Sequence, residues 1–377
     1  MSGSMPHPKF NRDQLRIKSL STRKNQLSVE KNMIPLSFFP SSISKKNKDL
    51  IKKISERIVS ARRNSRSVML VFGAHTIKNG LAPFLTELIR SGWVTHLATN
   101  GAGIIHDWEF AFQGKSGEDV RENVKNGQFG IWEETGFFIN LALIVGAYEQ
   151  LGYGESIGKM IFREGLQIPE PSSLLEEAGK TMAADPESAA AALDLLGVIS
   201  RNRIEPGFMS IPHPFKKYSV QCSAFNLDIP FTGHPMFGHD IIYSHPVNHG
   251  AAIGRTALND FLSYAHSVSN LDGGVYISIG SAVMSPMIFE KSLAMAQNIE
   301  IQNNKHIDNH FLVIADLAKS DWDWSGSGEP PADNPAYYLR YCKTFSRMGG
   351  EMHYITIDNR DFISELYHDL SGLNPAG

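Results

Sequence analysis

Residues 67–103, SVMLVFGAHTIKNGLAPFLTELIRSGWVTHLATNGAG, decide the fold class. The stretch opens with a continuous apolar run and a glycine-bearing turn, and LAPFLTELIRSGW then shows apolar residues at helical spacing. A second apolar run follows and ends in the turn TNGAG. A strand that is apolar on both faces belongs in a parallel sheet covered on both sides, and parallel neighbours need a right-handed crossover connection. The stretch therefore predicts strand, turn, helix, strand and turn within a parallel sheet.

Three later segments also run from apolar residues into small or acidic ones: GGVYISIGSA (273–282), HFLVIADLA (310–318) and EMHYITIDN (351–359). The stretches SLAMAQNI and NPAYYLRYCKTFSRMGG between them are typical of helical crossovers, and residues 45–67 predict an amphipathic helix. We therefore predict an α/β fold with a doubly wound, mostly parallel, Rossmann-like sheet. Residues 1–40 are expected to form an N-terminal arm, and 41–377 a single large domain with a helical insertion at about 130–205.

Composition excludes several classes of protein. The 377 residues carry 36 basic and 39 acidic side chains, so the net charge is −3 and no basic nucleic-acid footprint is present. No apolar run approaches the ~18 residues of a membrane span, and the polar N-terminus lacks a signal-peptide core. The two cysteines, Cys222 and Cys342, cannot form a disulfide framework. We expect a cytoplasmic protein with a small-molecule ligand and neither nucleic-acid nor membrane partners.

Small and polar residues follow each predicted strand, where ligands of open parallel sheets bind. Glycine lets the backbone approach a phosphate, hydroxyl and amide groups donate hydrogen bonds, and an aspartate can bind ribose hydroxyls. Each residue taken singly can also be a turn or a helix cap, so the prediction depends on five strands ending alike. NGAGIIH lacks the third glycine of a GxGxxG fingerprint. The predicted cofactor contacts are Gly73, His75, Thr76, Thr99, Asn100, Gly101, Gly280, Ser281, Asp316 and Asp358.

Several of these segments together resemble deoxyhypusine synthase. The similarity runs through residues 67–109, IPFTGHPMFGHDIIYSH, LDGGVYISIGSAV, HFLVIADLAKSDWDWSGSGEPPADNP and TIDN, and covers roughly residues 40–370. The resemblance implies a deoxyhypusine synthase-like NAD-binding fold, NAD as cofactor, and a homotetramer with sites at subunit interfaces. It also assigns the strand-end residues above to nucleotide contact.

The resemblance further implies NAD-dependent oxidation of an amine and an imine-forming lysine shortly after the acidic loop. In this chain that position falls at Leu339 or Arg340, and arginine stays protonated and cannot form an imine. Lys343, about one helical turn further on, is the candidate nucleophile. The family histidine after the glycine-rich strand has no counterpart in SAVMSPMIF.

Two other constellations are candidate parts of the site. Residues 213–249 hold five of the 14 histidines, which could be metal ligands or, as we favour, could line a substrate pocket, so we assign no metal site. The loop DWDWSGSGEPPADN places Asp321, Asp323, Glu329 and Asp333 beside two tryptophans, which suits a cationic amine or is a solvated acidic loop. The predicted catalytic residues are Lys343, Asp323, His239 and Asp240.

Our leading hypothesis is an NAD-dependent enzyme, of the transferase or oxidoreductase type, that oxidises an amine or amino-acid-like substrate or transfers an aminobutyl group. One alternative is an NAD-binding sensor or structural protein that has lost catalysis, because the family lysine and histidine are missing. Another is an ornithine cyclodeaminase-like enzyme, whose NAD-binding region GAHTIKNG and TNGAG also resemble.

Overall fold

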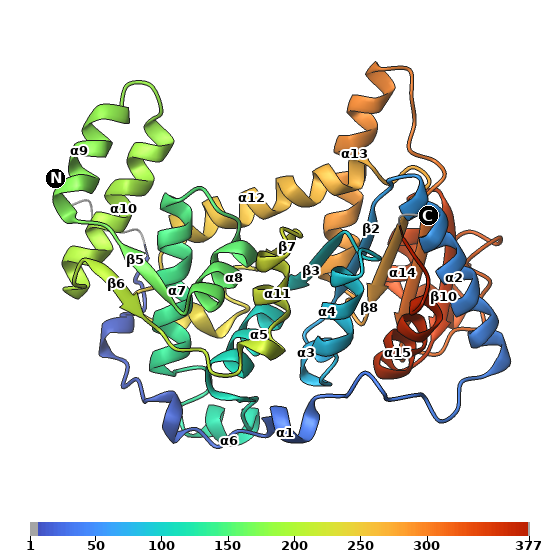
Figure 1. Cartoon of the computed structure of the whole chain (residues 1–377), viewed down its shortest axis with the longest axis horizontal. Helices are drawn as coiled ribbons and strands as arrows, with labels where there is room; N and C mark the ends of the chain where they lie inside the picture. The colour runs from blue at the N-terminus through green and yellow to red at the C-terminus, as the bar shows by residue number, and fades with distance from the viewer. Residues whose placement is uncertain (1–6, 376–377) are drawn as a thin grey trace.

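A parallel sheet of six strands forms the centre of the computed structural model, which describes residues 7–375. Its strands lie in the order β10 (Glu351–Thr356), β9 (Phe311–Asp316), β8 (Val275–Ile279), β2 (Val68–Phe72), β3 (His96–Asn100) and β7 (Phe231–His234). The chain builds outwards from β2, first through β3 to β7, then from β8 through β9 to β10, and every pairing is parallel. This is the strand order of a Rossmann fold, so the predicted fold class is confirmed (Figure 1).

Helices cover both faces of the sheet, because alternate residues of each strand are apolar on opposite sides. Val68, Leu70 and Phe72 belong to one hydrophobic cluster, and Met69 and Val71 belong to the other. The first cluster includes α2 (Lys45–Arg63), α4 (Ala82–Arg90) and α15 (Asn359–Leu370). The second includes α12 (Gly250–Ser269), α13 (Met284–Gln302) and α14 (Arg340–Ser346). Burial on two sides explains why the strands read as continuous apolar runs.

Helices also fill the region expected to be a helical insertion: α7 (Glu133–Tyr148), α8 (Tyr153–Arg163), α9 (Pro171–Thr181) and α10 (Pro186–Asn202). Two short strands, β5 (Gly165–Ile168) and β6 (Gly207–Ser210), pair antiparallel there and were not predicted. The other helices are α1 (Val29–Asn32), α3 (His75–Lys78), α5 (Gly101–Gln113), α6 (Val120–Lys125) and α11 (Val220–Asn226), and short 3-10 turns begin at residues 12, 20, 216, 241 and 335.

The sixth strand, β7, was missed. It has four residues, FTGH, and its glycine and histidine do not form an apolar run. Two interactions hold it as an edge strand: Leu97 pairs with Phe231 in the ladder, and on the open side the Gly233 amide donates to the Asp260 carboxylate at 2.5 Å. A strand this short is specified by its neighbours rather than by its own pattern.

The N-terminal arm runs along the edge of the sheet where the strands end. In Figure 1 the blue segment passes below α5 and α3 before it enters α2. Arg12 Nη1 donates to the Tyr243 carbonyl at 2.8 Å, β1 (Leu27–Ser28) pairs with β4 (Lys115–Ser116), and the Ile34 amide donates to the Gly80 carbonyl at 3.0 Å. Residues 1–6 of the predicted arm lie outside the described residues.

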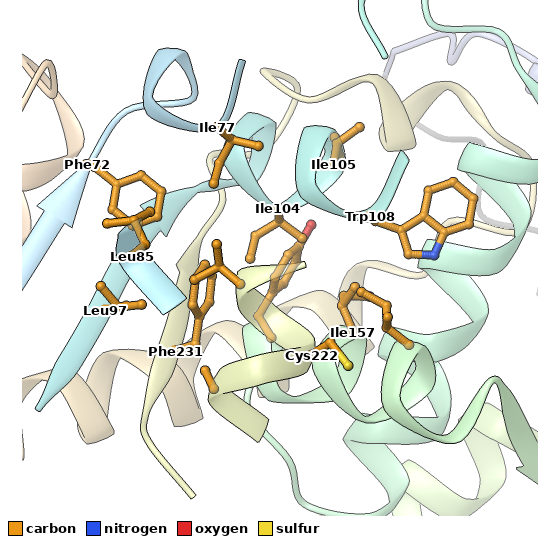
Figure 2. Close-up of a cluster of buried hydrophobic side chains, with 14 of the residues drawn as sticks. Phe72, Ile77, Leu85, Leu97, Ile104, Ile105, Trp108, Ile157, Cys222 and Phe231 are labelled. Carbon is orange, nitrogen blue, oxygen red and sulfur yellow. The ribbon is translucent and has the colours of Figure 1, made fainter. Parts of the chain in front are cut away.

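The core beneath this edge anchors α5. Figure 2 shows Phe72, Leu97 and Phe231 from three adjacent strands beside Ile104 and the other apolar residues of α5. The rings of Phe72 and Phe231 meet edge to face with centroids 6.1 Å apart. The apolar side of α5 is thereby fixed, which sets the position of the polar residues on its first turns.

Within residues 7–375, none of the helices combines the length and the hydropathy that crossing a bilayer requires.

Candidate functional site

The sheet has its topological switch point between β2 and β8, because the chain continues from β2 to β3 on one side and from β8 to β9 on the other. The Gly73 amide donates to the Ile279 carbonyl at 3.0 Å, and a Cβ on Gly73 would collide with the Gly280 carbonyl oxygen. Gly280 has φ +54°, and a Cβ there would meet nothing within 4 Å. Two glycine turns therefore meet at this point, and one of them presents bare backbone to open space.

Helix α13 begins at the same switch point. The Ser281 hydroxyl, 8% exposed, accepts a hydrogen bond from the Ser285 amide at 3.2 Å, while Ala282 is exposed. The N-terminus of a long helix carries partial positive charge and attracts anions. In α3, which follows the Gly73 turn, the Thr76 hydroxyl is buried without a hydrogen-bond partner among the described residues. The switch point thus combines open backbone at Gly280 with the N-terminus of a long helix.

Other predicted contacts serve the local structure. The Thr99 hydroxyl donates to the Phe72 carbonyl at 2.8 Å, and the Asn100 side chain accepts from the Gly103 amide at 2.9 Å and caps α5. His75 lies exposed on α3. These bonds hold the strand-to-helix turn in shape, and they occupy the Thr99 hydroxyl.

Two aspartates lie further along the same edge. Asp316 at the end of β9 accepts from the Ala318 amide at 3.0 Å. Asp358 caps α15, and its hydrogen bonds with Arg360 lower the pKa of its carboxyl group. Because β9 is next to β8, Asp316 is the nearer of the two to the switch point.

A cavity of about 200 Å³ lies at the start of α5, on the same edge of the sheet. The structure brings the predicted residues His239 and Asp240 together there. The rest of its lining is Arg23, Gln26, Lys78, Ala102, Ile105, His106, Gly117, Glu118, Val120, Phe129 and Ile241. The predicted residues Lys343 and Asp323 are not among the lining side chains.

Asp240 is an acid of this cavity with a shifted pKa. Its carboxylate lies over Gly101, where a Cβ would collide with it, and neither of its oxygens accepts a hydrogen bond from residues 7–375. Burial raises the pKa of Asp240 to about 6, against the opposing effect of His239. The hydroxyls of Tyr153 and Tyr243 are also buried without partners; burial, together with the charge of Asp240, raises the pKa of both. An acid with these properties can exchange a proton near neutral pH.

His106 lies in the second turn of α5 and lines the cavity. Its Nδ1 is 2.7 Å from the Ser116 hydroxyl oxygen, which in turn donates to Glu109 at 2.6 Å. Glu109 is held by two hydrogen bonds of 2.7 Å from Arg23, a residue of the N-terminal arm. Sequence reasoning missed His106, Lys78 and Arg23, because only the folded chain brings these three segments together.

Lys343 lies in α14, and its Nζ is 2.7 Å from Glu329 and 3.3 Å from the centroid of the Tyr337 ring. The hydrogen bond to Glu329 is the main reason that the pKa of Lys343 is raised. Asp323 accepts hydrogen bonds from the amide and hydroxyl of Ser325 within its own turn, and these lower its pKa. The ammonium of Lys343 is therefore stabilised, whereas an imine-forming amine must be neutral.

The histidines of residues 213–249 are spread over several places. His213 is buried beside Trp108, His245 lies near Glu133, and His249 caps α12. His234 hydrogen-bonds to Thr232 at 2.9 Å, and burial lowers its pKa to about 3. In the described part of the chain, no three His, Cys, Asp or Glu side chains form a group that could hold a metal ion.

The strand order, with its switch point between β2 and β8, defines an α/β protein of the Rossmann type. No protein-family model matches the chain, and a search of curated proteins finds no match. Among solved structures, the chain is similar to apo ArgZ, an arginine dihydrolase from the ornithine-ammonia cycle in cyanobacteria, with 14% identity and a TM-score of 0.42 over 86% of this chain and 33% of that one. It is also similar to AgrE in ternary complex with ornithine and NAD+, with 14% identity and a TM-score of 0.43 over 87% and 34% of the two chains.

A third similar structure is a conserved LOR/SDH protein from Methanococcus maripaludis S2, with 12% identity and a TM-score of 0.42 over 94% of this chain and 75% of that chain. The chain spans about a third of the length of ArgZ and AgrE. Likeness at this level carries no argument about activity, and the fold class follows from the sheet itself.

Proposed function

We propose that this chain is an NAD-binding enzyme that oxidises a small amine or amino-acid-like substrate. The observation that carries the proposal is the pair of glycine turns at the switch point between β2 and β8, together with the N-terminus of α13 that follows them. Rossmann folds bind dinucleotides at this point, because loops and helix N-termini of both halves converge there. The open backbone of Gly280 fits such a ligand.

The residues that would hold the dinucleotide follow from their placement. The Gly280 turn and the N-terminus of α13 suit its diphosphate, and Asp316 suits a ribose hydroxyl. Bound NAD would supply hydride acceptance. Asp240, in the neighbouring cavity, is suited to accept a proton from the substrate because burial brings its pKa to about 6.

Calorimetry with NAD and a charge variant tests the dinucleotide site. Ala282→Glu adds a negative charge at the N-terminus of α13, where an acidic residue stabilises the helix, so any loss of affinity comes from repulsion of the ligand. We expect NAD affinity to fall about tenfold or more, which corresponds to about 1.4 kcal/mol. Ala294→Glu, exposed further along the same helix, is the matched control and should change little. Absence of NAD uptake by the unaltered chain would overturn the proposal.

Catalysis is tested separately, by incubation with NAD and L-ornithine, L-arginine or spermidine while the absorbance of reduced nicotinamide is followed. NAD uptake without turnover would favour the second candidate, an NAD-binding sensor. The ion pair of Lys343 with Glu329 favours this second candidate over aminobutyl transfer, since it withholds the amine. A labelled butylamine adduct on Lys343 would instead support the transferase chemistry that the resemblance to deoxyhypusine synthase implies. That resemblance also leads us to propose a homotetramer, and light scattering tests the subunit number. The two cysteines suit a reducing compartment, so we propose a cytoplasmic location.

A further inference from the structure

We infer that the ligand of the cavity at the start of α5 is a small α-amino acid and that His106 selects its amino group. His106 does so through its neutral Nε2, and Ser116 and Glu109 keep the lone pair on that nitrogen. The inference deepens the proposed function and rests on it for the role of the cavity as the substrate site. It follows from the position of each proton around His106, from the side chains that face the same space, and from their charges.

The proton positions begin with Glu109. Its carboxylate accepts two hydrogen bonds from Arg23, one from the Thr135 hydroxyl at 3.0 Å and one from the Ser116 hydroxyl at 2.6 Å. Burial raises the pKa of Glu109, but the charge and hydrogen bonds of Arg23 outweigh it, so the net pKa is lowered and the group is ionised. An ionised carboxylate only accepts hydrogen bonds. The hydrogen of the Ser116 hydroxyl therefore points to Glu109.

With its hydrogen committed, Ser116 offers only lone pairs to His106. The His106 Nδ1, 2.7 Å away, must then carry a hydrogen and donate it. Burial lowers the pKa of His106 to about 4, and the charges of Lys78 and Arg23 act in the same direction against Glu109. The ring is neutral at pH 7, so its single hydrogen is on Nδ1 and its lone pair is on Nε2.

The lone pair of Nε2 is available to a ligand. His106 is one of the lining residues of the cavity, its ring is not fully buried, and no side chain or backbone group of residues 7–375 hydrogen-bonds to Nε2. Asp240 lines the same cavity with a carboxylate that also lacks donors. Two acceptors facing one space, one of them charged, match an ammonium group, which has three donors and no acceptor.

Lys78 supplies the opposite charge. It lines the cavity from the end of α3, and none of the acidic side chains in the described residues forms an ion pair with it. A ligand with an ammonium at one end and a carboxylate beside it satisfies all three groups. The cavity volume of about 200 Å³ restricts the ligand to a small molecule.

The proton assignment is tested without any ligand, by ¹⁵N NMR of the histidine side chains, with His106→Gln to assign the resonances. We expect a protonated Nδ1 and an unprotonated Nε2 for His106 at pH 7. In Ser116→Ala, which removes the acceptor of the Nδ1 hydrogen, we expect the two tautomers to mix. A protonated Nε2 in the unaltered chain would overturn the inference, as would an unchanged spectrum in Ser116→Ala.

The ligand class is tested by titration in the absence of NAD, so that failure of the dinucleotide site cannot affect the result. The probes are L-ornithine, 5-aminopentanoate, which lacks the α-amino group, and putrescine, which lacks the carboxylate. We expect L-ornithine to bind about tenfold or more tightly than either, and His106→Gln to remove its advantage over 5-aminopentanoate.

Lys78→Met should remove the preference in affinity for L-ornithine over putrescine. His266→Gln changes an exposed histidine on α12 and is the matched control, so it should keep the preference for L-ornithine over both other probes. Equal affinity of the unaltered chain for the three probes, or no binding of L-ornithine, would overturn the assignment of an amino acid. Loss of NAD binding with the L-ornithine preference intact would instead overturn the proposed function and leave the amino-acid site in place.

Discussion

Replacing Arg23 by methionine tests how the N-terminal arm is attached to the body of the protein. Arg23 and Glu109 form two parallel hydrogen bonds of 2.7 Å, and both side chains are 1% exposed. Removal of one partner of a buried pair leaves an uncompensated charge, which costs about 3–5 kcal/mol. We therefore expect Arg23→Met to lower the free energy of unfolding by about that amount in urea titrations at pH 7.

The matched control is Arg57→Met, because Arg57 pairs with Glu351 at 2.6 Å but its side chain is 50% exposed. An exposed pair contributes about 0–1 kcal/mol, so this variant should remain close to the parent. The double variant Arg23→Met/Glu109→Gln removes both charges and should recover part of the loss. If Arg23→Met lost no more stability than Arg57→Met, the argument that Glu109 depends on the arm would be refuted.

Three further predictions concern single positions. Gly73→Ala should destabilise the protein by about 1–3 kcal/mol in thermal unfolding, because its Cβ would collide with the Gly280 carbonyl. The control Gly254→Ala, in open space on α12, should stabilise it by about 0.5–1 kcal/mol. The opposite order of stabilities would contradict the packing at the switch point. Burial raises the pKa of Asp260 from 3.8 to about 8, so its contribution to the free energy of unfolding is greatest below pH 3.8 and is lost as pH rises through 8. Asp260→Asn should therefore make the free energy of unfolding, measured by urea titrations at several pH values, depend less on pH. An unchanged pH dependence would count against this role of Asp260. Asn100→Ala removes the cap of α5 and should cost about 1 kcal/mol by the same assay, with no loss meaning that the cap is not needed.

Much of the fold could be predicted from local sequence. Five of the six strands of the sheet were predicted, and the central ones include runs such as VMLVF and FLVIAD that are buried on both faces, as expected between two layers of helices. The four-residue strand β7 could not be predicted, since Phe231, Thr232, Gly233 and His234 pair with β3 and with Asp260 instead of forming a pattern of their own.

The candidate site was accessible to sequence reasoning only in part. His239 and Asp240 were predicted and line the cavity, but Lys78 lies in a segment predicted as a turn and His106 just after another, and neither was singled out. Lys343 was chosen by its distance from the acidic loop, and only the folded chain shows its Nζ beside Glu329. The catalytic and cofactor roles assigned to these residues remain predictions that the experiments above test.

The order of apolar runs and glycine turns in this chain was enough to determine a parallel α/β sheet whose strands end on one edge, because backbone hydrogen bonding and burial act on neighbouring residues. Tertiary structure decided which charges face one another: Arg23, Glu109 and Asp240 come from segments up to 217 positions apart, and whether each is paired or unpaired depends on distances of a few ångströms that no local pattern encodes. The protonation of each side chain follows from those distances, since burial and neighbouring charge set its pKa.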